Sequence, residues 1–200
     1  MQLLDPKAST QSSSFVLDNV TWDQYEALLN LFGDDQPGLR MNYLNGTLEL
    51  WMPGREHERL KKTLTRLIEA FAEEYDLELN GYGSTTFRKQ AKERGLEPDE
   101  CYCLGELKDF PDIAVEIALT TRVVDRFEIY RGLEVREVWV WRNKALVFYS
   151  LESPDQPYQV IPRSNILPQL DPELLLPHLE ETNQTRAVKV YRSRLRQNVV

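Results

Sequence analysis

Two acid-bearing segments carry carboxylates at spacings that suit a metal site. In PDIAVEIAL (111–119), a strand pattern places Asp112 and Glu116 on one face with only alanines between them. The upstream segment EPDECYCL (97–104) places Asp99 on the face that also carries both cysteines. Neighbouring strands that each present a carboxylate repel each other unless a cation or a basic side chain lies between them. The pattern therefore indicates either a cation site or an ordinary half-exposed strand surface.

Mg²⁺, or Mn²⁺ in its place, is the ion that best suits these residues. Hard divalent cations take one or two carboxylates and keep several waters for a substrate phosphate. Asp99 and Glu116 provide such a set, with Asp112 as an additional or alternative ligand. Zinc suits the sequence less well, because there are only two histidines and both cysteines point along one strand. The sequence has no P-loop, dinucleotide-binding fingerprint or serine-hydrolase elbow, which disfavours kinases, dehydrogenases and serine hydrolases.

The segments around these carboxylates resemble the Uma2 family of endonucleases, in the form abundant in cyanobacteria. This family belongs to the PD-(D/E)XK, restriction-endonuclease-like superfamily. The matching segments occur in the same order: NGTLE (45–49), EHE (56–58), EPDECY (97–102), PDIAVE (111–116), DRFEIYRGL (125–133) and REVW (136–139). The resemblance implies an α/β (mixed α+β) fold, in which a restriction-endonuclease-like core has a mixed central β-sheet flanked by α-helices.

The resemblance also implies roles for individual residues. Asp99 matches the PD element, Glu116 matches the acid of the (D/E)XK element, and Asp112 matches the family's second Pro-Asp pair. The lysine expected two residues after the glutamate is absent, since Ala118 stands there. The family often carries that lysine on the following helix, where this chain has Arg126. Arginine keeps the positive charge, but its pKa above about 12 makes it a poor proton acceptor.

Three functions remain open from the sequence. The preferred one is Mg²⁺-dependent hydrolysis of phosphodiester bonds in DNA, with Arg126 neutralising developing charge. The substitution at Arg126 keeps a second reading open, a catalytically impaired nuclease-fold protein that binds nucleic acid without turnover. A metal-dependent phosphodiesterase acting on a small nucleotide is the third.

Glu56 and His57 stand at the start of a long amphipathic helix, HERLKKTLTRLIEAFAEEY (57–75). At about 100° per residue, His57 falls on the side of the apolar stripe and Glu56 near its edge. By analogy with an acid on the superfamily's first helix, Glu56 is a candidate third acid and His57 a candidate proton shuttle. The alternatives are a helix-start acid favoured by the helix dipole and a structural histidine.

The remaining elements follow from local signals. Thr21 and Gln24 form a capping box that predicts a helix over 21–32, and Asn45-Gly46 predicts a hairpin over 41–52. Trp139 and Trp141 are predicted to lie in the core of a central strand. Further strands are predicted at 77–82, 84–88, 97–104, 112–119, 136–141, 145–151 and 158–162, a short helix at 123–133, and a helix from 171 that continues into the basic tail.

The 200 residues make one domain with an average globular composition, 42 % hydrophobic and 28 % charged. Residues 1–14 are predicted to be a flexible tail, and residues 15–200 a single nuclease domain with a C-terminal helical, basic extension. The sequence shows no signal peptide and no apolar run of about 18 residues, so neither secretion nor a membrane span is expected. Two cysteines placed where they do not form a disulfide favour a reducing, cytoplasmic location.

The net charge of −8 disfavours bulk electrostatic coating of nucleic acid but allows a local site. Two basic runs, at 55–66 and 186–196, are either phosphate contacts or solvated helix faces. DNA is the partner that the preferred function implies, and a homodimer is a further expectation.

Overall fold

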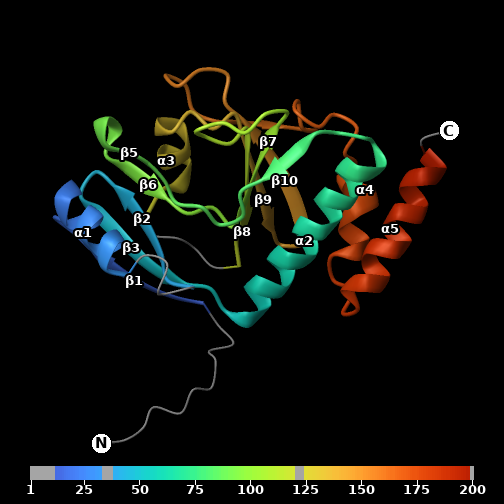
Figure 1. Ribbon diagram of the computed structural model, residues 1–200, viewed down its shortest axis with the longest axis horizontal. Coiled ribbons are helices and arrows are strands. Elements are labelled where there is room, and N and C mark those ends of the chain that lie inside the picture. Colours follow the sequence, from blue (N-terminus) through green and yellow to red (C-terminus); the bar gives the residue numbers. More distant parts are fainter. Residues whose placement is uncertain (1–11, 33–37, 120–123, 199–200) are drawn as a thin grey trace, which may run out of the picture.

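The computed structural model describes residues 12–32, 38–119 and 124–198. A five-stranded antiparallel sheet forms its N-terminal side, at the left of Figure 1. Helix α1 (Trp22–Phe32) packs on this sheet, and its Tyr25 stacks on Tyr43 with ring centroids 4.9 Å apart. In spatial order the strands are β1 (Ser13–Leu17), β3 (Thr47–Met52), β2 (Arg40–Leu44), β6 (Arg94–Leu96) and β5 (Phe87–Lys89).

A six-stranded sheet forms the centre of the protein. Strands β8 and β9 are parallel, whereas every other neighbouring pair is antiparallel, so the sheet is mixed. Helices cover its faces, which confirms the predicted mixed sheet flanked by helices; the separate five-stranded sheet was not foreseen. In spatial order the strands are β11 (Gln159–Ile161), β10 (Ala145–Ser150), β9 (Glu137–Arg142), β8 (Ile113–Ile117), β7 (Glu100–Leu104) and β4 (Leu79–Gly81).

Local sequence signals account for the first helix and hairpin. The backbone N–H of Thr21 donates to Gln24 Oε1 at 2.8 Å, and the N–H of Gln24 donates to Thr21 Oγ1 at 3.2 Å, which confirms the capping box. Strands β2 and β3 are joined by Asn45 and Gly46, with φ of 46° and 88°. That left-handed geometry is the one an Asn-Gly hairpin turn requires.

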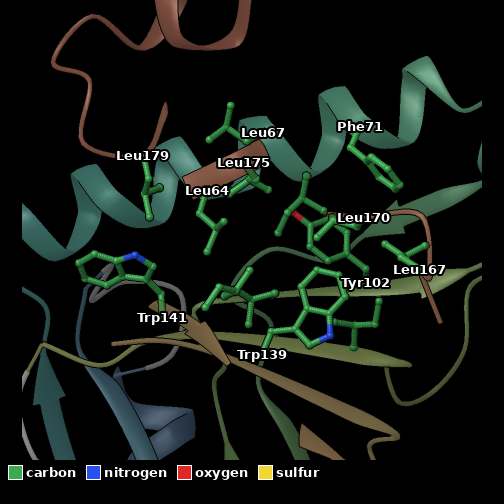
Figure 2. Packing of buried hydrophobic residues seen from close by; sticks show 14 of the residues in the cluster. Leu64, Leu67, Phe71, Tyr102, Trp139, Trp141, Leu167, Leu170, Leu175 and Leu179 are labelled. Carbon is green, nitrogen blue, oxygen red and sulfur yellow. The ribbon is translucent and has the colours of Figure 1, made fainter. Parts of the chain in front are cut away.

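Helix α2 (Arg55–Glu74) crosses one face of the six-stranded sheet and buries its apolar stripe there (Figure 2). Trp139 and Trp141 lie below it, and both are buried as predicted. The C-terminal segment completes this core with Leu167, Leu170, Leu175 and Leu179, which Figure 2 shows beside the helix.

The opposite face of the sheet packs against α3 (Arg126–Gly132), which connects the parallel strands β8 and β9. Cys101 and Ala114 are register partners and are both fully buried on this face. Cys101 and Cys103 are free thiols, and burial raises the pKa of Cys101 above its ordinary value.

The C-terminal third is more broken than the sequence suggested. Helix α4 (Pro172–Leu175) ends in a 3₁₀ turn (Leu176–His178) that contains Pro177, and α5 (Gln184–Asn198) is a separate helix. Proline lacks the N–H that a continuing helix would use, and the Asn183 side chain starts the new helix by accepting from the N–H of Arg186 at 3.0 Å. The prediction of one helix running from 171 into the tail was therefore wrong.

Both termini differ in part from the predicted organisation. Strand β1 begins at Ser13, so the last two residues of the predicted tail 1–14 lie in a strand, and residues 1–11 lie outside the described residues. Helix α5 docks on α2 through Glu74, which accepts from Arg192 Nη1 at 2.8 Å and from Arg196 Nε at 2.7 Å. These two arginines of the basic run therefore bind acid within the protein. No helix in the described part of the chain is long and apolar enough to cross a membrane.

Candidate active site

The pairing of β7 with β8 brings Asp99 and Glu116 together. Cys101 pairs with Ala114, so the residues two positions away on each strand share the same face of the sheet. The backbone N–H of Ile117 donates to Asp99 Oδ2 at 2.6 Å, which fixes the end of β7 beside Glu116. Asp99 is fully buried and Glu116 is 6 % exposed. The carboxylates of Asp99 and Glu116 therefore lie at the same end of the strand pair.

The carboxylate of Asp99 is held on both oxygens. Arg40 of β2 forms a buried ion pair with Oδ1, and His57 Nε2 lies 2.9 Å from Oδ2. Burial alone would raise the pKa of Asp99, but the hydrogen bond to His57 and the charge of Arg40 hold it well below its ordinary value. Asp99 is therefore an anion with its charge already compensated.

Glu116 is held in a similar way from α3. Arg126 Nη2 donates to Glu116 Oε1 at 2.5 Å, and the Tyr130 hydroxyl donates to the same oxygen. Arg126 also donates to the Glu97 carbonyl at 2.9 Å and to Asn42 Oδ1 at 3.3 Å. Burial would lower the pKa of Arg126, but the Glu116 charge outweighs it and raises the pKa above its ordinary value. Arg126 therefore stays cationic and does not accept a proton.

His57 lies between two acids. Its Nδ1 is 3.4 Å from Glu58 Oε1, and the ring packs edge-on against Trp51 at 4.7 Å between centroids. Burial would lower the pKa of His57, but the hydrogen bonds to Asp99 and Glu58 outweigh it and raise the pKa above its ordinary value. His57 thus retains its proton more readily than a free histidine and serves to hold Asp99.

Acidic side chains also line the edge of the cluster. Arg40 Nε lies 3.4 Å from Glu97 Oε1, and Arg40 Nη2 lies 3.5 Å from Glu58 Oε1. Glu58 also pairs with Lys61 at 2.8 Å. Burial would raise the pKa of Glu58, but its hydrogen bonds to His57 and Lys61 bring it down to about 2.

Sequence reasoning missed Glu49, which lies fully buried on β3. Asn42, its register partner on β2, donates to Glu49 Oε2 at 3.0 Å and thereby links it to Arg126. Strand alternation in TLELWM (47–52) places Glu49 on the same face as Trp51, so a strand that buries Trp51 also points Glu49 inward. Arg40, Asn42, Glu58 and Tyr130 were also missed.

The structure does not bring Asp112 or Glu56 to this cluster. Asp112 precedes β8, at the opposite end of the strand from Glu116, where it pairs with Lys108 and Arg136 and accepts from the N–H of Leu104. Glu56 is exposed and pairs with Arg59 at 2.7 Å.

The side chains of the cluster offer mainly carboxylate oxygens, the type of ligand that hard divalent cations prefer. Among the described residues, no three His, Cys, Asp or Glu side chains converge as a ready-made metal site. The cluster nevertheless holds more carboxylates than arginines, and carboxylate oxygens are the ligands that Mg²⁺ and Mn²⁺ prefer. The acids are Glu49, Glu58, Glu97, Asp99 and Glu116, and the arginines are Arg40 and Arg126. An added cation would share Asp99 and Glu116 with these guanidinium groups.

Comparisons with known proteins place the chain in a family. A solved structure described as a "putative nuclease" from Anabaena variabilis resembles it with a TM-score of 0.49 and 15 % identity, over 65 % of this chain and 84 % of that chain. No curated protein matches the chain. The model of the Uma2 family, described as "Putative restriction endonuclease", matches residues 22–192. Because this match spans most of the 200 residues, the family predicted from the sequence is confirmed, and the chain belongs to the Uma2 family.

Proposed function

We propose that this protein hydrolyses phosphodiester bonds in DNA with the help of Mg²⁺ or Mn²⁺. One observation carries the proposal: the buried carboxylates of Asp99 and Glu116 lie at the same end of the paired strands β7 and β8, and each is paired with an arginine. Membership of the Uma2 family, whose description is "Putative restriction endonuclease", supports the same reaction class. Such a cluster attracts a divalent cation, and a cation next to basic side chains attracts a phosphodiester.

Each residue of the cluster has a definable task. Asp99 and Glu116 would hold the ion. When bound, the ion would lower the pKa of a water molecule and would place positive charge beside the phosphate. Arg40 and His57 fix the Asp99 carboxylate. Arg126 keeps its charge beside Glu116 and can donate a hydrogen bond to a phosphate oxygen.

The experiment is incubation of the full chain with supercoiled plasmid and with labelled oligonucleotides, with and without Mn²⁺ or Mg²⁺. We expect cleavage only with metal, and its loss in Asp99→Asn and Glu116→Gln. Glu152→Gln removes an exposed carboxylate elsewhere and is the matched control. Metal-independent cleavage, or equal cleavage by the parent and the two site variants, contradicts the proposal.

A second candidate is a nuclease-fold protein that binds nucleic acid without turnover. The contact that favours it is the Arg126–Glu116 ion pair, because arginine does not accept a proton from a nucleophilic water. Calorimetric titration with Mg²⁺ and Mn²⁺ separates the two candidates. Absence of metal binding at millimolar concentration, together with a DNA mobility shift, favours the binding protein.

We further propose a cytoplasmic location and a homodimer. Two free buried cysteines support a reducing compartment. Sedimentation velocity of the full chain tests the dimer, which requires a species of twice the 23.4 kDa chain mass.

A further inference from the structure

A cavity of about 630 Å³ opens directly beside the candidate active site. It lies between α3 and the face of the six-stranded sheet formed by β8, β9 and β10. Glu116, Arg126 and Tyr130, which belong to the cluster described above, form part of its wall. A ligand in this cavity would therefore touch the same carboxylate that the proposed reaction uses.

The rest of the wall is suited to a flat, largely apolar group. Val138 and Val140 of β9 and Val147 of β10 line the sheet side. Phe127 and Tyr149 add two aromatic rings whose centroids are 4.6 Å apart. Small-molecule sites are typically cavities of roughly 300–1,000 Å³ with apolar and aromatic walls and a few polar groups. This cavity has that size and that lining.

Arg126, whose side chain forms part of the cavity wall, also carries a buried hydrogen-bond donor without a partner among the described residues. Arg126 is 7 % exposed, and its Nε has no hydrogen-bond partner within the described part of the chain. A buried charged donor without an acceptor costs free energy, so a small shift of the guanidinium toward an acceptor on a bound ligand would be favoured. Arg142 and Asn143, at the turn between β9 and β10, add further polar groups to the wall.

We infer that this cavity receives a nucleobase of the substrate strand, with the attached phosphate at Glu116 and Arg126. The inference rests on the proposed function, since it names the part of the same substrate that lies next to the site. Aromatic rings stack against a base, which strengthens its binding whatever the sequence, and the branched side chains add apolar contact. The guanidinium of Arg126 donates to an oxygen of the nucleotide. The base must be unstacked to enter, so single-stranded or locally opened DNA is the preferred substrate.

The test compares ligands with and without a base, in the absence of metal and turnover. The full chain is titrated by calorimetry with deoxyadenosine 5′-monophosphate and with deoxyribose 5-phosphate. We expect the nucleotide to bind at least about tenfold more tightly, in keeping with the stacking contribution. An oligonucleotide carrying 2-aminopurine, whose emission rises on unstacking, is expected to brighten on binding.

Two variants are designed to fill the cavity, and a third variant serves as a control. Val147→Trp and Val140→Phe place bulk in the space and are expected to weaken nucleotide binding at least about tenfold. Val160→Trp adds the same bulk on β11 of the same sheet, at a side chain that is 65 % exposed, and is expected to bind like the parent. Thermal unfolding checks that each variant folds. Because there are two filling variants, the test still stands if one of them does not fold.

The outcomes separate this inference from the proposed function. Equal binding of the two phosphates, or unchanged binding in the folded filling variants, overturns the inference even if plasmid is cleaved. Base-dependent binding that the filling variants abolish supports it even if no metal cleaves DNA, in which case the proposed reaction fails alone. A dimer that Val147→Trp disrupts, without nucleotide binding, overturns it and assigns the cavity to a second copy of the chain.

Discussion

Arg126 and Glu116 form a buried ion pair, with Nη2 of the arginine 2.5 Å from Oε1 of the glutamate. Both side chains are less than one-tenth exposed, and the Tyr130 hydroxyl donates to the same carboxylate oxygen. The sequence alone left open whether a cation or a basic side chain relieves repulsion between neighbouring carboxylates. In the folded protein, Arg40 pairs with Asp99 and Arg126 pairs with Glu116, so a basic side chain lies beside each carboxylate.

Arg126→Lys is expected to raise Mn²⁺-dependent cleavage. A lysine near a metal-bound water can lose its proton when buried, whereas arginine stays charged. Arg126→Ala is expected to lower any activity that the parent shows, because it removes the charge beside Glu116. Plasmid nicking at matched protein concentration measures both variants. A parent that is faster than Arg126→Lys would show that arginine is the competent residue.

Asp99→Asn and Glu116→Gln are expected to abolish metal binding and also to destabilise the fold. Glu116→Gln removes the carboxylate paired with the buried Arg126, and breaking such a pair costs about 3–5 kcal/mol. Asp99→Asn should cost less, because Arg40 keeps its contacts with Glu58 and Glu97. Calorimetric metal titration and urea unfolding measure the two effects. Full stability in metal-free buffer would contradict the ion pairs described here, whereas unchanged metal affinity would contradict the assignment of ligands.

Asp112→Asn is expected to leave metal binding unchanged. Its carboxylate pairs with Lys108 and Arg136, whose side chains are 43 % and 63 % exposed, so the loss in the free energy of unfolding should be about 1 kcal/mol or less. The asparagine can still accept from the N–H of Leu104. Metal affinity that falls as far as in Asp99→Asn would return Asp112 to the ligand set.

The affinity for DNA is expected to fall as the salt concentration rises, because exposed basic residues of the C-terminal tail contact phosphates. Arg186, Lys189 and Arg194 are exposed, whereas Arg192 and Arg196 bind Glu74. The log–log slope of affinity against salt should fall by about 0.9 for each phosphate contact removed. Replacing the three exposed residues by glutamine, with Lys92→Gln as a control at the exposed 3₁₀ turn between β5 and β6, tests this in a fluorescence titration. An unchanged slope would leave the tail as solvated surface.

Low pH is expected to weaken the contact between α5 and α2, because Glu74 becomes protonated. Hydrogen bonds from Arg196 and Arg192 lower the pKa of Glu74 from 4.5 to about 2. Because the folded-state pKa is the lower one, this contribution is complete above about pH 4.5 and is lost as the pH falls towards 2. Hydrogen exchange of α5 amides at pH 3 and pH 6 should differ more in the parent than in Glu74→Gln. Equal differences would show that the pair does not hold the helix.

Much of the fold could be predicted because its signals are local. The capping box at Thr21, the Asn45-Gly46 turn and the apolar stripe of α2 each depend on residues a few positions apart. The division into two sheets could not be predicted, because it depends on which edges pair across long stretches of chain. The break at Pro177 was readable from proline chemistry but was overlooked.

The sequence predicted only the part of the candidate site that lies on one pair of consecutive strands. Asp99 and Glu116 follow from alternation on two consecutive strands. Arg40 and Glu49 come from the other sheet, and no pattern in one segment specifies that contact. Glu56 was predicted as a third acid by analogy with an acid on the superfamily's first helix, whereas Glu58 is the acid that reaches His57 and Arg40.

The rate at which Cys101 and Cys103 react with an alkylating reagent reports how often the sheet opens. Both thiols have no exposed surface, and the high pKa of Cys101 keeps it in the unreactive thiol form. An alkylating reagent can therefore reach them only when β7 separates from its neighbours. The rate of labelling in native buffer, followed by mass, would give the lifetime of the closed sheet in the parent and in every variant named above.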